Sequence, residues 1–188
     1  MVPHQNTYSA ANPSPATITV APGPGGAVTV SPVSYDSVSG TVYLAGRHDP
    51  SIQTLVRVPN IPGGPSLFKL VSRPVRPNQT WGTLTALDLT NGGRALWQVK
   101  MQKPLVGGTL ATAGGLVFTG EASGHFSAYD AATGKALWTY QTGANVGAPP
   151  MSYMVNGRQF VAVATGAARG AEALRPGGAI LAFALPTP

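Results

Sequence analysis

Two segments of this chain, GTLTALDLTNGGRALW and GHFSAYDAATGKALW, are near-copies of each other. They cover Gly82–Trp97 and Gly124–Trp138, and each leads from a strand-forming stretch through an Asp and a Gly-containing turn to a terminal Trp. A third, weaker copy, GAILAFAL, covers Gly178–Leu185 and has Ala184 where the Asp would fall. Strand-forming repeats about 40 to 50 residues apart are typical of β-propellers. The sequence therefore predicts sheets that stack on one another as propeller blades.

The composition agrees with an all-β protein. The 24 Gly and 18 Pro residues favour turns, and only 10% of the residues are charged. The absence of cysteine excludes disulfides, Cys-ligated zinc, iron–sulfur clusters and thiol catalysis within this chain. The net charge of +6 is spread among prolines and strands, so we interpret it as solvated surface charge and expect no nucleic-acid partner. We expect no transmembrane segment and no signal peptide in this chain.

The strand pattern predicts a partial β-propeller of about three four-stranded blades with tryptophan-docking motifs. We place an extended lead-in at residues 1–26 and the partial propeller at 27–188, with blades at about 27–101, 105–142 and 145–185. The third blade is expected to lack its outermost strand, because the pattern yields too few strand-forming runs there.

Two stretches outside the regular repeats leave alternatives open. Thr17–Val20 is a short β-branched run that is either an edge strand or the missing outer strand of the last blade. Residues 47–80 contain one weaker strand, Gln53–Val58, followed by a segment rich in Pro and Gly. We expect that segment to be an irregular surface excursion or contact loop. The dipeptide Asn156-Gly157 predicts a tight hairpin in the last blade.

The repeated Trp and Asp residues are predicted to have structural roles. Trp97 and Trp138 are suited to fill the joint between neighbouring sheets, where burial of an indole contributes at most about 4 to 6 kcal/mol. Asp36, Asp88 and Asp130 precede tight turns, where a carboxylate accepts hydrogen bonds from the backbone N–H groups.

Few other residues suggest chemistry. His4, His48 and His125 are isolated in the sequence and are interpreted as surface or turn residues. Glu121 ends an apolar strand at an expected blade rim, and it remains a candidate for contact with a substrate, a metal or a partner.

The repeats resemble a known family. The run Gly108–Gly143, followed by Pro149–Gly166 and Ala182–Pro186, resembles the C-terminal blades of pyrroloquinoline-quinone (PQQ)-dependent alcohol dehydrogenases. Its Ala-x-Asp, Thr-Gly-Lys and Leu-Trp elements are similar to that family's tryptophan-docking motif, and Ser31–Gly46 resembles the start of an earlier blade. The resemblance implies an eight-bladed quinoprotein dehydrogenase, usually periplasmic, that holds PQQ and Ca²⁺ or a lanthanide ion near the axis and passes electrons to a cytochrome.

The same resemblance supplies the predicted cofactor-binding residues. The positions expected to face the axis are Thr29, Val30, Leu105, Val106, Gly107 and Gly108. The alternative is that they only line an apolar channel. In the family, the metal-binding carboxylates and the catalytic Asp come mostly from blades that have no counterpart here. We therefore predict no catalytic and no metal-ligating residue in this chain.

Two functions are compatible with this reading. The first is the C-terminal portion of a PQQ-dependent alcohol dehydrogenase, inactive alone, that forms part of the propeller and of the quinone cavity wall. Its partners would be the remaining blades on another chain, or further copies of itself, and a cytochrome electron acceptor. The second is a non-catalytic propeller-type module for binding or assembly, whose open sheet edges recruit partners.

Overall fold

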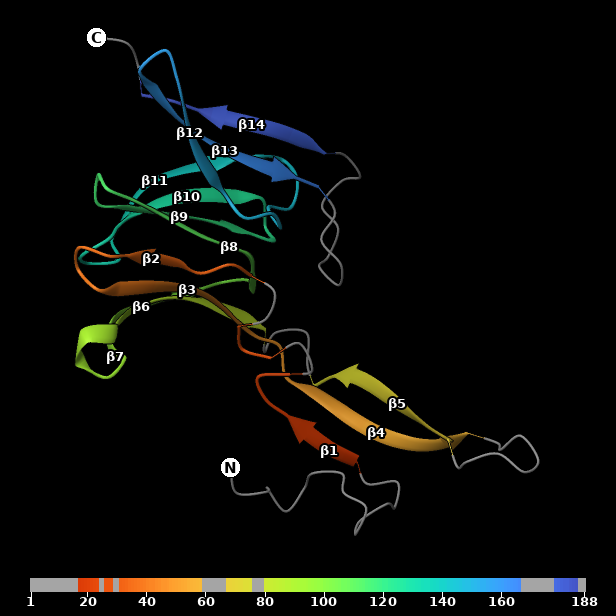
Figure 1. The fold of residues 1–188 in the computed structure, drawn as a ribbon. Coiled ribbons are helices and arrows are strands. Elements are labelled where there is room, and N and C mark those ends of the chain that lie inside the picture. The colour runs from red at the N-terminus through yellow and green to blue at the C-terminus, as the bar shows by residue number, and fades with distance from the viewer. Residues whose placement is uncertain are drawn as a thin grey trace. The chain divides into compact units, whose positions relative to one another are not determined.

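The computed structural model describes residues 17–23, 26–28, 31–58, 67–75, 80–166 and 178–185. Their strands form four antiparallel sheets, and the one helical element among them is a short 3₁₀ turn (Figure 1). The chain divides into two compact units, one of residues 1–26 and 48–80 and one of residues 27–47 and 81–188. The all-β prediction is confirmed.

The first blade has four strands in the order β2-β3-β6-β7. These strands are β2 Ser34–Asp36, β3 Thr41–His48, β6 Trp81–Asp88 and β7 Arg94–Met101. The 3₁₀ turn η2, Leu89–Asn91, links β6 to β7 and ends at Gly92, which has a φ of 68°. The positive φ suits Gly because it has no Cβ to clash.

The second blade repeats this arrangement with no insertion. Its strands are β8 Leu105–Thr112, β9 Leu116–Glu121, β10 His125–Asp130 and β11 Ala136–Gln141, hydrogen-bonded in sequence order. Ala128 lies opposite Trp138, as Ala86 lies opposite Trp97, and in both pairs the register shifts at the next residue. The two copied segments therefore have the same fold, including the same bulge.

The third blade has three strands among the described residues. They are β12 Met151–Val155, β13 Arg158–Thr165 and β14 Ala179–Phe183. The predicted hairpin joins β12 to β13, and Asn156 and Gly157 both have positive φ, at 50° and 76°. β14 pairs with β13 on one side. No fourth strand joins this sheet within the described ranges.

The inserted unit corrects two predictions. β1 Thr17–Val20, β4 Ser51–Val58 and β5 Leu67–Pro74 form a three-stranded sheet in the order β1-β4-β5. Thr17–Val20 pairs with β4, so the hypothesis that it completes the last blade is wrong. The segment after β4 is not wholly irregular, because eight residues of β5 pair with β4. Pro74 lies at the end of its strand, where its missing N–H costs little.

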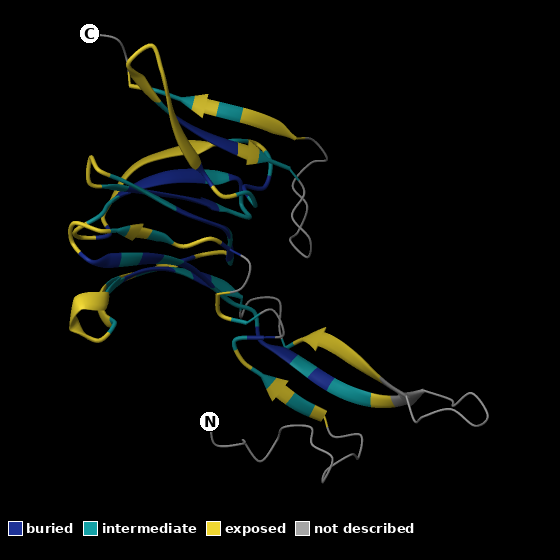
Figure 2. Ribbon diagram, in the orientation of Figure 1, coloured by how far each residue is buried: buried dark blue, intermediate teal, exposed yellow. Residues whose placement is uncertain are grey.

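Two apolar clusters hold the three blades together, and both lie in the darkest strands of Figure 2. One combines Tyr43 and Leu84 of the first blade with Leu105, Val117 and Tyr129 of the second. The other combines aromatic and small residues of the second blade with β13: its buried members are Phe118, Phe126, Ala128, Val146, Val161 and Val163. Successive residues of β9 and β10 thus point to opposite faces of the second blade. Both faces of this sheet are buried, one against each neighbouring blade.

Candidate functional site

Trp97 docks the first blade onto the second. Its indole Nε1 donates a hydrogen bond of 3.0 Å to the carbonyl oxygen of Ala131. Its ring lies 5.9 Å from that of Tyr43, whose hydroxyl donates to the same carbonyl at 3.3 Å. A Cβ on Gly134 would lie 2.6 Å from Cε3 of the indole, so the ring occupies the space above that glycine. The Thr-Gly-Lys turn is therefore a receptor for the preceding Trp.

Trp138 occupies the equivalent place between the second and third blades but is less enclosed. It packs edge-on against Phe183 and Phe126, with centroid distances of 5.1 and 6.0 Å, and stacks on Tyr140. It remains 38% exposed.

Asp36, Asp88 and Asp130 each accept hydrogen bonds within their own turn. Asp130 accepts hydrogen bonds from the hydroxyl and the N–H of Thr133, at 2.7 and 2.8 Å. Asp88 accepts the same pair from Thr90, and Asp36 accepts from Ser39 and Val38. The side-chain hydrogen bond is the main cause that lowers the pKa of each carboxyl from its ordinary value. These residues are structural, as predicted.

The predicted cofactor-binding positions that the structure describes all lie in β8. Thr29 and Val30 lie outside the described residues. Leu105 is 1% exposed and belongs to the apolar cluster between the first two blades. The carbonyl of Val106 accepts a hydrogen bond of 2.9 Å from the hydroxyl of Ser31, and Val106 is half-buried. The assignment of these positions to a cofactor stays a prediction.

Gly107 and Gly108 allow the backbones of the three blades to approach closely. A Cβ on Gly107 would lie 2.9 Å from the carbonyl oxygen of Ala148, and a Cβ on Gly108 would lie 2.7 Å from that of Pro32. Gly108 also has a φ of 79°. The glycine pair is therefore the point where the segments that precede β2 and β12 meet β8. We call Ser31, Pro32, Leu105–Thr109 and residues 146–148 the β8 junction.

Sequence reasoning did not single out Thr109, the polar centre of the β8 junction. Its hydroxyl oxygen lies 2.8 Å from that of Ser34, and its hydroxyl donates to the carbonyl oxygen of Tyr43 at 3.0 Å. Its backbone N–H donates to the carbonyl oxygen of Pro32. Thr119 donates to the carbonyl oxygen of Gly108 in the same way. A Thr in the middle of a mostly apolar strand was the available signal, because buried hydroxyls need hydrogen-bond partners.

The part of the chain that the structure describes does not supply a metal centre. Ca²⁺ binds six to eight oxygen ligands, several of them from carboxylates. No group of three or more His, Cys, Asp or Glu side chains that could hold an ion occurs there, and Asp36, Asp88 and Asp130 are committed to their turns. The described residues therefore do not fit the metal of a quinoprotein by themselves. Within these ranges, no helix has the length and hydropathy needed to cross a bilayer.

Comparison with known proteins identifies the fold family. The PQQ glucose/ethanol/alcohol dehydrogenase β-propeller domain matches residues 68–161, half of the chain. The chain belongs to this PQQ propeller family. The quinohemoprotein alcohol dehydrogenase of Comamonas testosteroni is 38% identical to this PQQ propeller chain over 173 residues, which are 83% of the chain and 24% of the relative. The quinoprotein ethanol dehydrogenase of Pseudomonas aeruginosa is 45% identical over 45% of the chain and 14% of its own length.

The structural comparison agrees. A crystal structure of the Comamonas testosteroni enzyme superimposes with a TM-score of 0.74 and 34% identity, over 94% of this chain and 29% of the solved chain. The PQQ propeller chain thus spans about a quarter or less of the curated relatives named here. The resemblance inferred from the tryptophan repeats is confirmed at the level of family and fold.

Proposed function

We propose that this chain is the C-terminal part of the propeller of a PQQ-dependent alcohol dehydrogenase. The observation that carries the proposal is the docking of Trp97 on Ala131 and Gly134. This contact joins two neighbouring blades, and it is made by the same residues on which the family resemblance rests. The match of residues 68–161 to the family's propeller domain supports it further. The completed enzyme would oxidise a primary alcohol or a related hydroxyl compound and work in the periplasm.

The chain's own contribution would be to build and seal part of the quinone cavity wall. PQQ, with Ca²⁺ or a lanthanide ion, would supply the two-electron oxidation when bound. Leu105, Gly107 and Gly108 would form a close-packed, water-excluding wall, since all three are buried. Val106 is half-buried and is the most accessible residue of the run Leu105–Gly108. The catalytic and metal-binding side chains would come from the remaining blades.

A dye-linked assay tests this division of labour. The isolated 188-residue chain, supplied with PQQ, Ca²⁺ and ethanol, is expected to show no turnover. A polypeptide carrying the other blades of the Comamonas testosteroni enzyme is expected to gain activity when this chain is added. Turnover by the chain alone would overturn the proposed inactivity, and failure of complementation with a folded partner would argue against the propeller role.

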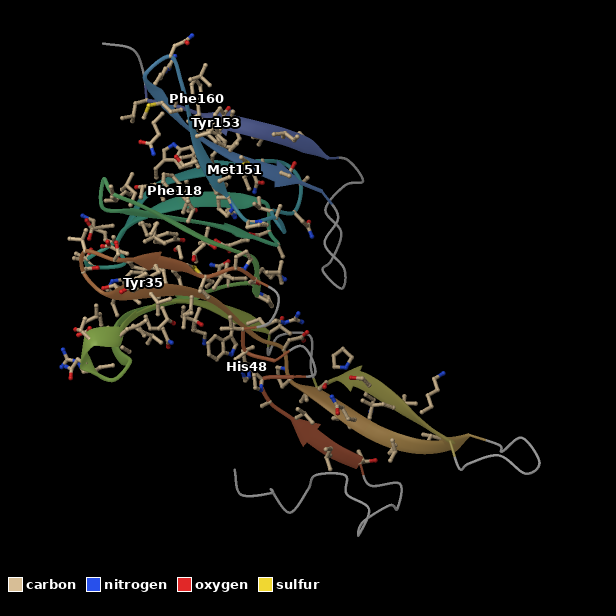
Figure 3. The ribbon with its side chains drawn as sticks, viewed as in Figure 1. Tyr35, His48, Phe118, Met151, Tyr153 and Phe160 are labelled. Atoms are coloured by element: carbon tan, nitrogen blue, oxygen red, sulfur yellow. The ribbon has the colours of Figure 1, made fainter. Side chains whose placement is uncertain are left out.

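The exposed surface of the third blade favours a second function, as a non-catalytic assembly module. Tyr153 on β12 lies beside Phe160 on β13 (Figure 3), and the rings of these two residues stack with a centroid distance of 5.3 Å. Met151 is 58% exposed and Ile180 on β14 is 82% exposed. Such a surface beside a strand with one paired neighbour suits contact with further blades or further copies of the chain.

The molar mass of the isolated chain tests the assembly module. Size-exclusion chromatography with light scattering is expected to give oligomers for the isolated chain, whether PQQ is present or absent. A stable monomer that nevertheless complements the missing blades would favour the enzyme fragment alone. A cytochrome acceptor would contact only the completed enzyme, so reduction of cytochrome c is a readout for the complemented sample.

A further inference from the structure

A hydrogen-bonded chain of side chains links the β9–β10 turn to the end of β11. The hydroxyl oxygen of Ser123 lies 3.2 Å from Oε2 of Glu121 and 3.0 Å from Nδ1 of His125. Nε2 of His125 lies 3.4 Å from Nε2 of Gln141. We call these four residues the His125 network. The side chains of these four residues make none of the hydrogen bonds described above for the β8 junction or for the tryptophans.

The surrounding backbone determines which imidazole nitrogen carries the proton. The N–H of Gly143 donates to Oε1 of Gln141 at 3.0 Å, so the amide oxygen of Gln141 is turned toward Gly143. Its NH₂ group therefore faces the carbonyl oxygen of Ser123, at 3.3 Å, and Nε2 of His125. Because an amide NH₂ can only donate, Nε2 of the imidazole must be the acceptor.

The rest of the network follows from that orientation. A neutral His125 that accepts at Nε2 carries its proton on Nδ1 and donates it to the hydroxyl of Ser123. Ser123 then donates its own hydrogen to the carboxylate of Glu121. Every donor meets an acceptor in this one protonation state.

A second proton on His125 would break this match. It would bind Nε2 and point at the NH₂ group of Gln141, so that two donors would face each other across 3.4 Å. The contact would open, and Gln141 would lose its fixed orientation toward Gly143.

The ionisable groups near the imidazole are few. β9 contributes Glu121, β10 contributes Tyr129 and Asp130, and β11 contributes Tyr140. β8 and residues 142–150 contain no ionisable side chain. Burial is the main cause that raises the pKa of Tyr129, which therefore stays neutral near neutral pH. Glu121 is thus the acidic group coupled to the imidazole through a hydrogen bond.

The residues after Gln141, the last residue of β11, connect the second blade to the third. Immediately after it, Thr142 donates its N–H and its hydroxyl to the carbonyl oxygen of Gly124, both at 2.9 Å. Four residues further, Val146 donates its N–H to the carbonyl oxygen of Glu121, at 3.1 Å. The carbonyls of residues 146 and 148 in turn lie against Gly107. The connection that follows Gln141 therefore ends against the β8 junction.

We propose that His125 is a pH-sensitive switch, and that its protonation opens the contact with Gln141 and loosens residues 141–146 where they connect two blades. The connection of residues 141–146 would then have two states. When His125 is neutral, Gln141 holds the connection through its contacts with His125 and Gly143, and when His125 is charged, these contacts are lost. The device requires no cofactor and operates in the chain whether or not the proposed dehydrogenase is correct.

Nuclear magnetic resonance tests the proposal directly. At pH 8, long-range ¹H–¹⁵N spectra are expected to show His125 protonated at Nδ1. Between pH 8 and pH 5, the protection factor of the Gly143 amide, corrected for intrinsic exchange, is expected to fall about five- to tenfold, the effect of one lost hydrogen bond. His48, which lies outside the His125 network, is the internal control in the same spectra.

A variant that replaces the donor of Gln141 by an acceptor is the second test. In Gln141→Glu, a carboxylate faces Nε2 and can accept from the charged imidazole, so the Gly143 amide is expected to stay protected at pH 5. Should the variant fail to fold, the tautomer of the unmodified chain remains a test. A proton on Nε2 at pH 8, or an acid response unchanged in Gln141→Glu, would overturn the proposal.

Discussion

Trp97 donates its indole N–H to the carbonyl oxygen of Ala131 at 3.0 Å, which joins the last strand of one repeat to the turn of the next. The same carbonyl also receives the hydroxyl of Tyr43. The docking contact therefore consists of two donors from one blade that converge on one acceptor of its neighbour. Trp138, the matching residue of the second blade, packs on the ring of Phe183 and is 38% exposed.

Replacement of the two tryptophans is expected to have unequal effects. Trp97→Phe removes the hydrogen bond to Ala131 and part of the ring that covers Gly134, so the free energy of unfolding should fall by about 2 kcal/mol. Trp138→Phe removes a ring that is 38% exposed and should cost about 1 kcal/mol. Urea unfolding followed by circular dichroism measures both, and equal losses would contradict the docking geometry.

Gly134→Ala should disrupt the docking contact from the receiving side. The new Cβ would lie 2.6 Å from the indole of Trp97, at a position whose φ is 73°. Gly143→Ala is a matched control, because Gly143 has a φ of 79° and no heavy atom within 4 Å of an added Cβ. Both variants carry the backbone strain, but Gly134→Ala should be less stable by a further 1 to 3 kcal/mol or so. Tryptophan fluorescence should change only in Gly134→Ala.

Gly107→Ala tests the close approach at the β8 junction. Its Cβ would lie 2.9 Å from the carbonyl oxygen of Ala148 and 3.0 Å from that of Val146, so the connection to the third blade must move. We expect a loss of about 1 to 3 kcal/mol in the free energy of unfolding. Gly114→Ala is the control, since its Cβ would approach only the hydroxyl of Thr112, at 3.9 Å. A similar loss in both variants would count against the junction.

Acid should destabilise the Asp130 turn. The hydroxyl and N–H of Thr133 lower the pKa of Asp130, so the folded chain binds a proton less readily than the unfolded chain. The contribution to stability is therefore complete above the unfolded pKa of 3.8 and is lost as the pH falls through the lowered folded pKa. Urea midpoints between pH 6 and pH 2 should fall less steeply in Asp130→Asn than in the unmodified chain. Thr133→Ala, which removes the main cause of the shift, should also flatten the profile.

The repeat predicted the blades because local pattern and packing agree there. The copied segments are continuous in sequence, and the offsets that align Asp88 with Asp130 are the offsets that place each Asp at its turn. The inserted sheet was harder to predict. β5 carries no alternation of buried and exposed residues, and its strand state depends on pairing with β4, which lies across a Pro- and Gly-rich stretch.

The candidate site, too, could be predicted from the sequence only in part. Gly107 and Gly108 were identified through the family resemblance, but the backbone segments that require them come from residues 32 and 146–148, far away in sequence. Thr109 and the His125 network depend on which side chains the register brings together. His125 has no partner motif in the sequence, and only the fold places Gln141 beside it.

The insertion between β3 and β6 also bears on the order in which the blades form. These strands pair across residues 49–80, whereas β9 and β10 pair across residues 122–124. Because the entropic cost of loop closure grows with the logarithm of loop length, closing the longer loop costs about 2 kcal/mol more. The second blade should therefore nucleate folding, and the first should assemble on it later.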